Sequence, residues 1–339
     1  MRIVIDAMGG DHAPREVVLG TARAAARSRA RLCLVGDEKK IQDILRELPR
    51  SKNLEVRHAE EYIRMDETPG TNLRRRDQAS MVVGARMIKQ GEAEALVCAG
   101  NTGALHQVAL LEIGRLPGIR RPALAAVFPT SRSPSLALDM GANTDCKPEY
   151  LFQFAVMGSI YAEKVLERRN PRVALLNIGT EAGKGNALVG AAYELLSGSA
   201  LNFVGNVEPT GFFSGDVDVV VCDGFVGNLV LKTSEAVAEW LMDRVRQAAR
   251  RNTAAKIGGH LLRPSLRSLK QDISHSEHGG AVLLGLKGVV VKCHGRATAE
   301  TVENGIRVAS RALEKNLVSL ISSSLHPDHQ EGGKREVRT

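Results

Sequence analysis

Residues 2–28 read RIVIDAMGGDHAPREVVLGTARAAARS, and the pattern in this stretch decides the fold. Residues 2–8 are mostly apolar, which is typical of a strand buried on both faces. A loop with two glycines follows. Residues 14–28 then have the spacing of a helix with proline in its first turn. The chain therefore begins as a strand–loop–helix unit.

The same unit recurs along the chain. Strands are predicted at 31–36, 54–59 and 95–100, and then in LAAVF, LALDMG, VALLNIG, VDVVVCDG and GVVVKCHG, with helices between most of them. Continuous apolar strands joined by helices indicate a parallel sheet that is covered on both faces. We expect a doubly wound α/β/α sandwich with a mostly parallel sheet. It should form a single domain over residues 1–321, with a basic helical excursion at about 235–275 and a disordered tail at 322–339.

Composition places the chain among ordinary soluble globular proteins. It has 339 residues, of which 43% are hydrophobic and 25% are charged. No apolar run reaches the roughly 18 residues that span a bilayer, and the N-terminus has no signal-peptide pattern. The five cysteines lie far apart and form no C-x-x-C pair. We therefore expect a cytoplasmic protein without disulfides, metal or other cofactor.

Polar loops follow six of the predicted strands, at the carboxyl ends where an open parallel sheet binds ligands. Each combines glycine with Asn, Thr, Asp, Lys or His. These loops are GGDHAP (9–14), NTGA (101–104), ANTDCK (142–147), GTEAGKGN (179–186), GFVGN (224–228) and HGRA (294–297). Turns favour such residues in any case. Six of them on one edge of a parallel sheet nevertheless predict a shared polar site.

Lys184 lies in the loop that most resembles a phosphate-binding loop, between Gly183 and Gly185. A nucleotide-binding P-loop has four residues between its two glycines and a Ser or Thr after the lysine. Here the spacing is one residue shorter and Gly185 follows the lysine. A G-x-G-x-x-G pattern is also missing after the first strand. The sequence therefore favours a loop for inorganic phosphate or a small phosphorylated group.

Several candidates also have a purely structural interpretation. Asn101 or Thr102 is suited either to cap the next helix or to hold an anion at its N-terminus. Asp145 and Lys147 are alternatively a surface ion pair. Cys146 is a poor nucleophile, because no base lies near it in sequence. The candidate phosphate or substrate ligands are Gly10, Asp11, His12, Gly100, Asn101, Thr102, Gly103, Asn143, Thr144, Lys147, Gly183, Gly185 and His294.

Six blocks together resemble the phosphate acyltransferase family of bacterial phospholipid synthesis. They are DAMGGDHAP, AGNTGAL, LDMGANTDCKPEYLFQFAVMG, LLNIGTEAGKGN, DVVVCDGFVGNLVLK and GVVVKCHG, which run in order from residue 1 to about 315. The resemblance implies transfer of a fatty acyl group from acyl carrier protein to inorganic phosphate. It also implies a homodimer with a fold like those of isocitrate and isopropylmalate dehydrogenases and phosphotransacetylases. Departures from the family pattern are Cys98, where Ser is usual, His278, where Tyr is expected, and Arg296, where a small residue normally follows.

The implied chemistry suits the residues. Phosphate is already an anion near neutral pH, so its attack on a thioester requires positioning and donors for the developing oxyanion more than a general base. We take Lys184, Asn228 and Asp145 as the catalytic candidates. A helix cap is the alternative role for Asn228.

Two other function classes fit less well. A metal-dependent decarboxylating dehydrogenase of the same fold requires clustered arginines at the strand ends, and these loops lack them. A nucleic-acid-binding protein is expected to interleave aromatic residues with its basic ones. The basic stretch at 241–270 contains no aromatic residue beyond the adjacent Trp240. We therefore expect no nucleic-acid partner.

The stretch 241–270 carries nearly the whole net positive charge of the chain. It holds eight Lys and Arg residues against Asp243, whereas the net charge of the protein is +8. Its apolar residues recur at helical spacing on both sides of Gly258 and Gly259. Such cationic amphipathic helices suit an anionic membrane surface, and a dimer interface or a docking site for the acidic carrier protein are the alternatives. The expected contact residues are Arg250, Arg251, Leu261, Leu262, Arg263 and Arg267.

Overall fold

The computed structural model describes residues 1–325 with the exception of residues 69, 71, 72, 74, 253, 254, 259 and 264–279. Its strands are β1 (Arg2–Asp6), β2 (Arg31–Gly36), β3 (Leu54–His58), β4 (Ala95–Cys98), β5 (Ala123–Phe128), β6 (Ser135–Leu138), β7 (Val173–Leu176), β8 (Phe203–Val207), β9 (Val219–Val221), β10 (Ala281–Leu284) and β11 (Val289–Lys292).

Helices alternate with most of these strands, as the sequence predicts. They are α1 (Arg15–Arg27), α2 (Glu38–Leu45), α3 (Ser80–Lys89), α4 (Thr102–Val108), the π-helical turn η2 (Ala109–Ile113), α5 (Pro148–Lys164), α6 (Ala187–Ser197), α7 (Pro209–Ser214), α8 (Gly224–Ala248), α10 (Ala299–Glu314) and α11 (Leu317–Ser324). Local chemistry sets several boundaries. The Asp37 side chain accepts a hydrogen bond from the N–H of Lys40 and so caps α2, and Pro148 occupies the first turn of α5.

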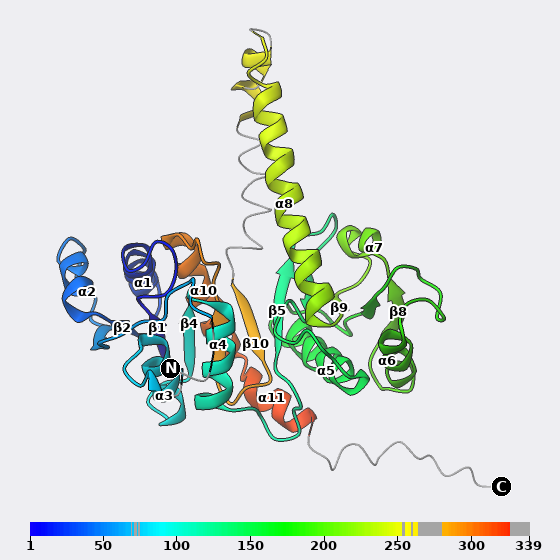
Figure 1. Ribbon diagram of the computed structural model, residues 1–339, viewed down its shortest axis with the longest axis horizontal. Coiled ribbons are helices and arrows are strands. Elements are labelled where there is room, and N and C mark those ends of the chain that lie inside the picture. The colour runs from blue at the N-terminus through cyan, green and yellow to red at the C-terminus, as the bar shows by residue number, and fades with distance from the viewer. Residues whose placement is uncertain are drawn as a thin grey trace.

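One eleven-stranded sheet runs through the molecule in the order β3-β2-β1-β4-β11-β10-β5-β6-β9-β7-β8. Alternate residues of β1 face opposite sides of it. Ile3 and Ile5 belong to a core packed by α1, α5, α6, α10 and α11, whereas Val4 belongs to a second core packed by α3, α4 and η2. Figure 1 shows the sheet with these helices gathered in two lobes. The doubly wound α/β/α architecture is confirmed.

Strand direction reverses in the middle of the sheet. β10 is antiparallel to both β11 and β5, and β5 is antiparallel to β6, whereas the strands on either side of this centre are parallel to their neighbours. The carboxyl ends of β1, β4 and β11 therefore point the opposite way from those of β6, β9 and β7. The expectation that all six polar loops share one edge is wrong, because it assumed parallel strands throughout, whereas β5 and β6 pair antiparallel.

The carboxyl-terminal part of the chain differs from expectation in one detail. Helix α11 extends to Ser324, so residues 322–324 are helical rather than part of a disordered tail. Leu317, Ile321 and Leu325 are buried against the core, which explains why the helix continues this far. Residues 326–339 lie outside the described part of the chain.

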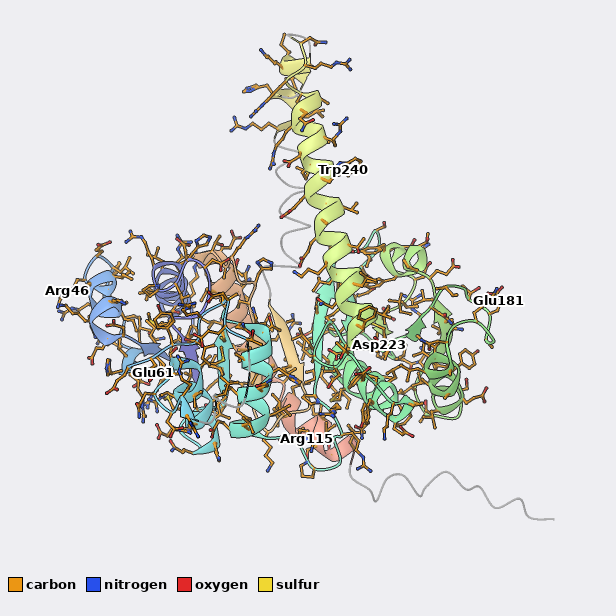
Figure 2. The ribbon with its side chains drawn as sticks, viewed as in Figure 1. Arg46, Glu61, Arg115, Glu181, Asp223 and Trp240 are labelled. Carbon is orange, nitrogen blue, oxygen red and sulfur yellow. The ribbon has the colours of Figure 1, made fainter. Side chains whose placement is uncertain are left out.

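Helix α8 forms an arm that projects away from both lobes (Figure 1). Figure 2 shows Asp223 at its base and Trp240 part-way along it. The basic residues Arg250, Arg251 and Arg263 are exposed near its far end, whereas Arg267 lies outside the described residues. None of the described helices has a stretch long and apolar enough to cross a membrane.

Candidate active site

A row of buried polar side chains crosses three neighbouring strand ends. Asp6 of β1 is the register partner of Cys98 of β4, which is in turn the partner of Lys292 of β11. Partners in parallel strands point to the same face of a sheet. Ser80 of α3 donates a hydrogen bond to Asp6 Oδ1 at 2.6 Å, and the Cys98 thiol donates to Oδ2 at 3.2 Å. The row therefore joins β1 and β4 to the helix above them.

Burial governs the ionisation of this row. It raises the pKa of the Asp6 carboxyl, although Ser80, Cys98 and backbone N–H groups oppose the shift. It raises the pKa of the Cys98 thiol well above its ordinary value and lowers the pKa of the Lys292 ammonium. Cys98 is therefore a hydrogen-bond donor to Asp6, a role that a serine hydroxyl could also fill.

Close backbone contacts bring the loops after β1, β4 and β11 together. A Cβ atom on Gly9 would lie 2.7 Å from both Asp6 Oδ2 and the Gly100 nitrogen, so only glycine fits. The N–H of Asp11 donates to the carbonyl of Gly295 at 2.8 Å. The structure thus assembles four of the predicted ligands, with His12 exposed beside them. These four are Gly10, Asp11, Gly100 and His294.

Asn101 is occupied by contacts within the protein. Its Oδ1 accepts the N–H of Ala104 at 3.0 Å, so it caps α4. Its Nδ2 donates to the carbonyls of Met65, at 3.0 Å, and Glu67, at 2.9 Å. Asn101 therefore fixes the segment 61–68 beside the strand ends. Thr102 and Gly103 are exposed in the first turn of α4.

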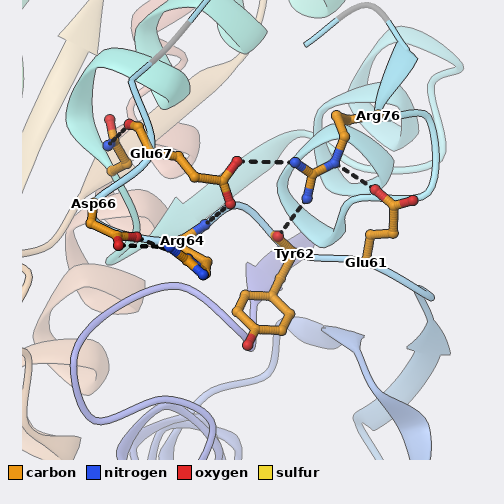
Figure 3. A network of polar contacts seen from close by, with 7 residues as sticks. Glu61, Tyr62, Arg64, Asp66, Glu67 and Arg76 are labelled. Carbon is orange, nitrogen blue, oxygen red and sulfur yellow. Dashed lines mark hydrogen bonds and ion pairs between the residues drawn. The ribbon is translucent and has the colours of Figure 1, made fainter. Parts of the chain in front are cut away.

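The segment 61–68 is held at its other side by Arg76 (Figure 3). The Arg76 guanidinium donates to Glu61 at 2.5 Å, to Glu67 at 3.0 Å and to the carbonyl of Tyr62 at 2.8 Å. The Met65 methyl group lies against Gly295, where an added Cβ would come within 2.8 Å of it. This segment therefore packs directly on the loop after β11.

A second polar cluster lies where β6 ends. The Asp139 carboxylate accepts four hydrogen bonds, from the N–H groups of Leu124, Ala142 and Asn143 and from Asn143 Nδ2, at 2.7–3.0 Å. Asn143 Nδ2 also donates to the carbonyl of Pro122 at 2.7 Å. Burial raises the pKa of Asp139, against the effect of these donors. Both amide hydrogens of Asn143 thus hold the turn, which leaves none for phosphate.

Helix α8 begins against this turn. Asp223 caps it by accepting the N–H groups of Phe225 and Val226, each at 2.9 Å. The capping alternative for Asn228 is therefore wrong, because that residue lies inside the helix. Asn228 is exposed, and its side chain packs against Gly141, where an added Cβ would lie 3.3 Å from Asn228 Cβ. Among the residues that the structure describes, no hydrogen bond occupies its amide group, which makes that group a candidate donor to a substrate.

The loop between β6 and α5 is mostly open to solvent. Thr144, Asp145 and Lys147 are exposed. Among the described residues, no ion pair within 4.0 Å joins Asp145 to Lys147, so the surface-pair interpretation is not supported. Burial raises the pKa of the Cys146 thiol to about 12, which agrees with its dismissal as a nucleophile.

Two buried asparagines support the Lys184 loop from below. Asn177 Nδ2 donates to the carbonyl of Lys184 at 2.9 Å, and Asn206 Nδ2 donates to that of Glu181 at 2.8 Å. Gly185 adopts φ +99°, and an added Cβ would lie 2.7 Å from Asn177 Oδ1. Asn186 then caps α6. These contacts hold the backbone, while the Lys184 side chain is exposed.

Helix α8 links the two polar clusters. Asn228 and Lys232 are four residues apart and so lie on one side of the helix. The charge of Lys232 contributes to lowering the pKa values of Lys292 and His294, after the larger effect of burial. The first turn of α8 thus meets the β6 cluster, and its third turn lies within electrostatic range of the β11 end.

Sequence reasoning missed the residues that anchor both clusters. Asp6, Asp139 and Lys292 were all treated as parts of apolar strands. Each nevertheless stands at the carboxyl end of such a run, in RIVID, LALD and VVVK. A charged residue that ends a fully buried strand is the signal that would have identified them, because an isolated buried charge is unfavourable.

Comparison with known proteins agrees with the earlier resemblance. Residues 1–320 match the family model described as fatty acid synthesis protein. A phosphate acyltransferase of Moorella thermoacetica is 46% identical over 321 residues, which cover 95% of each chain. The chain belongs to this family. A phosphate acyltransferase of Heliobacterium modesticaldum is 46% identical over 327 residues, which cover 96% of this chain and 98% of that protein.

The fold of this member of the fatty acid synthesis protein family is similar to those of several solved structures. A phosphotransacetylase from Streptococcus pyogenes superimposes with a TM-score of 0.62 at 18% identity, over 93% of this chain and 94% of that one. A 4-hydroxythreonine-4-phosphate dehydrogenase from Klebsiella pneumoniae gives 0.53 at 14%, over 91% and 98%. At such identities the likeness concerns the fold alone. It confirms the expected relation to phosphotransacetylases and dehydrogenases.

Proposed function

We propose that this protein transfers a fatty acyl group from the thioester of an acyl carrier protein to inorganic phosphate. The observation that carries this proposal is the match over nearly the full length to phosphate acyltransferases at 46% identity. The residues fit the reaction, because the chain offers glycine-rich strand ends, an exposed lysine and an exposed asparagine amide.

In the proposed step, a phosphate oxygen forms a bond to the acyl carbon while the carbon–sulfur bond breaks. The products are acyl phosphate and the thiolate of the carrier. Lys184 supplies positive charge to phosphate or to the developing oxyanion, and Asn228 supplies an amide donor at the reacting carbonyl. Asp145, which is exposed in the loop after β6, is kept as a further catalytic candidate. The assembled loops after β1, β4 and β11 carry the candidate substrate ligands Gly10, Asp11, Gly100 and His294.

The direct test incubates the purified protein with acyl carrier protein thioester and phosphate. Hydroxylamine trapping should report acyl phosphate, and a thiol reagent should report an equal amount of free carrier. Sulfate in place of phosphate serves as the control. Thiol release without any trapped acyl phosphate would show a hydrolase and defeat the proposal.

We further infer that the protein forms a homodimer through α8. Phe225, Leu229, Val237 and Trp240 recur at helical spacing along the arm and are more than half exposed, with Trp240 at 63%. A second copy of this helix would bury these apolar side chains. Trp240→Glu should shift the sedimentation coefficient to that of a monomer. Val204→Glu, an exposed apolar site on β8, should leave it unchanged. Equal behaviour of the two variants would contradict the interface.

The tip of the arm is proposed to contact anionic membranes peripherally. Leu261 is 73% exposed and lies next to exposed Leu262 and Arg263. Basic residues near anionic lipid contribute about 1 kcal/mol each. Leu261→Glu with Leu262→Glu should abolish co-sedimentation with phosphatidylglycerol vesicles. The matched control is Leu195→Glu with Val204→Glu. If the tip variant still binds vesicles but loses affinity for the carrier protein, the tip is a docking site instead.

A further inference from the structure

Lys292 is a buried cation without a partner anion in the described structure. Its side chain is 8% exposed, and its ammonium group donates to the carbonyl of Cys293. None of the ion pairs between described residues includes it. Lysine is almost never buried this deeply unless it is paired. An ammonium group also has three hydrogens, and this one contact uses a single one of them.

Three loops that contain glycine lie at the strand ends around Lys292. It ends β11 in the same row as Cys98 and Asp6, directly beneath the loops that Gly9, Gly100 and Gly295 allow to meet. Asp6 does not neutralise it, because the hydrogen bonds of that carboxylate go to Ser80, Cys98 and the N–H of Met8. The positive charge of Lys292 therefore lies at the carboxyl end of β11, next to loops that contain glycine.

Further basic side chains lie within electrostatic range of Lys292 or follow it in the chain. His294 and Arg296 follow Lys292 in the loop after β11, and Lys232 acts on Lys292 and His294 from the third turn of α8. Two carboxylates are also in range: Asp11, whose charge acts on Lys292, and Glu235, which acts on His294 and pairs with Lys232 at 2.6 Å. Repulsion among the cations contributes to lowering the pKa of His294, after the larger effect of burial. An anion bound between them would remove this repulsion.

We propose that the ends of β1, β4 and β11 form a binding site for a phosphate group, with Lys292 as its buried cation and Lys232 and His294 at its rim. The identity of the ligand rests on the proposed function. Both substrates of that reaction contain a phosphate group. One source is inorganic phosphate, and the other is the phosphodiester of the prosthetic arm that carries the thioester.

The test compares Lys292→Met and Lys232→Met with Lys287→Met, which removes an exposed lysine from the β10–β11 turn. Inorganic phosphate binding is measured by calorimetry, and the KM values for phosphate and for acyl carrier protein are measured separately. We expect at least a tenfold loss of phosphate affinity, or a tenfold rise in one KM, for Lys292→Met and a smaller effect for Lys232→Met. Lys287→Met should match the wild type.

A truncated donor, acyl-pantetheine without its phosphodiester, separates the two sources. If the site holds inorganic phosphate, the KM for phosphate rises with either donor. If it holds the phosphodiester, Lys292→Met raises the KM for the intact carrier but not for the truncated donor. Phosphate affinity and both KM values within twofold of wild type in the two variants would overturn the proposal.

Two controls keep the result interpretable. Lys292→Met removes a buried charge and keeps the length of the side chain, so its thermal unfolding should occur at or above that of the wild type. If it does not fold, Lys232→Met at the surface decides the question. If the wild type binds phosphate through Lys292 but forms no acyl phosphate, the proposed function fails and this site stands.

Discussion

Asn228→Asp separates the catalytic role of this residue from any role in folding. The change keeps the size of the side chain and adds one negative charge inside the first turns of α8, which Asp223 already caps. A carboxylate near a helix N-terminus is stabilising by less than about 1 kcal/mol, so the fold should be retained. Two unit negative charges at ~5 Å in an effective dielectric of ~20 repel by about 3 kcal/mol. We therefore expect kcat/KM for phosphate to fall on the order of 100-fold.

The assay is the hydroxylamine trap over a range of phosphate concentrations, with urea unfolding as the measure of stability. Asn228→Ala isolates the loss of the amide, which should cost ~2- to 10-fold at the usual net strength of a hydrogen bond. Gln247→Glu adds the same charge about 28 Å further along α8, beyond the Debye length, and should change neither quantity. Asn228→Asp with normal turnover would refute the placement of Asn228 at the reacting centre.

Three further predictions follow from the site. Lys184→Ala should unfold at the same temperature as the wild type, because Asn177 and Asn206 hold its loop through the backbone. The variant should nevertheless lose most acyl phosphate formation. Undiminished turnover at saturating phosphate would exclude a role for the charge of Lys184. Acyl phosphate formation should persist in the presence of a chelator, and strict dependence on magnesium would contradict this. Burial, and then the charge of Arg121, lower the pKa of His106 from its ordinary 6.5, so the unfolded chain takes up this proton first as the pH falls. The free energy of unfolding should therefore decrease below about pH 6.5. Urea unfolding at about pH 7.5 and about pH 5.5 measures this decrease, which should be smaller in His106→Met than in the wild type. An equal decrease in both proteins would show that other groups are responsible.

The local units of the fold could be predicted from the sequence because they depend on short-range chemistry. Apolar runs such as RIVID predicted strands, and helical spacing with Pro14 at the start predicted α1 to within one residue at each end. The individual polar loops were predicted for the same reason, since glycine and asparagine after a strand are visible one loop at a time. The family resemblance was likewise carried by blocks that are contiguous in the chain.

Tertiary structure alone decided which loops meet. The sequence analysis predicts no strand at residues 281–284, yet β10 lies antiparallel between β11 and β5, and the antiparallel pairing of β5 with β6 reverses the direction of the second half of the sheet. The same packing turned Asn101 and Asn143 from expected phosphate ligands into structural supports, since hydrogen bonds to residues distant in sequence occupy their amides. It also buried Lys292 beneath three loops. These outcomes depend on contacts between segments far apart in the chain, which local periodicity and turn chemistry do not encode.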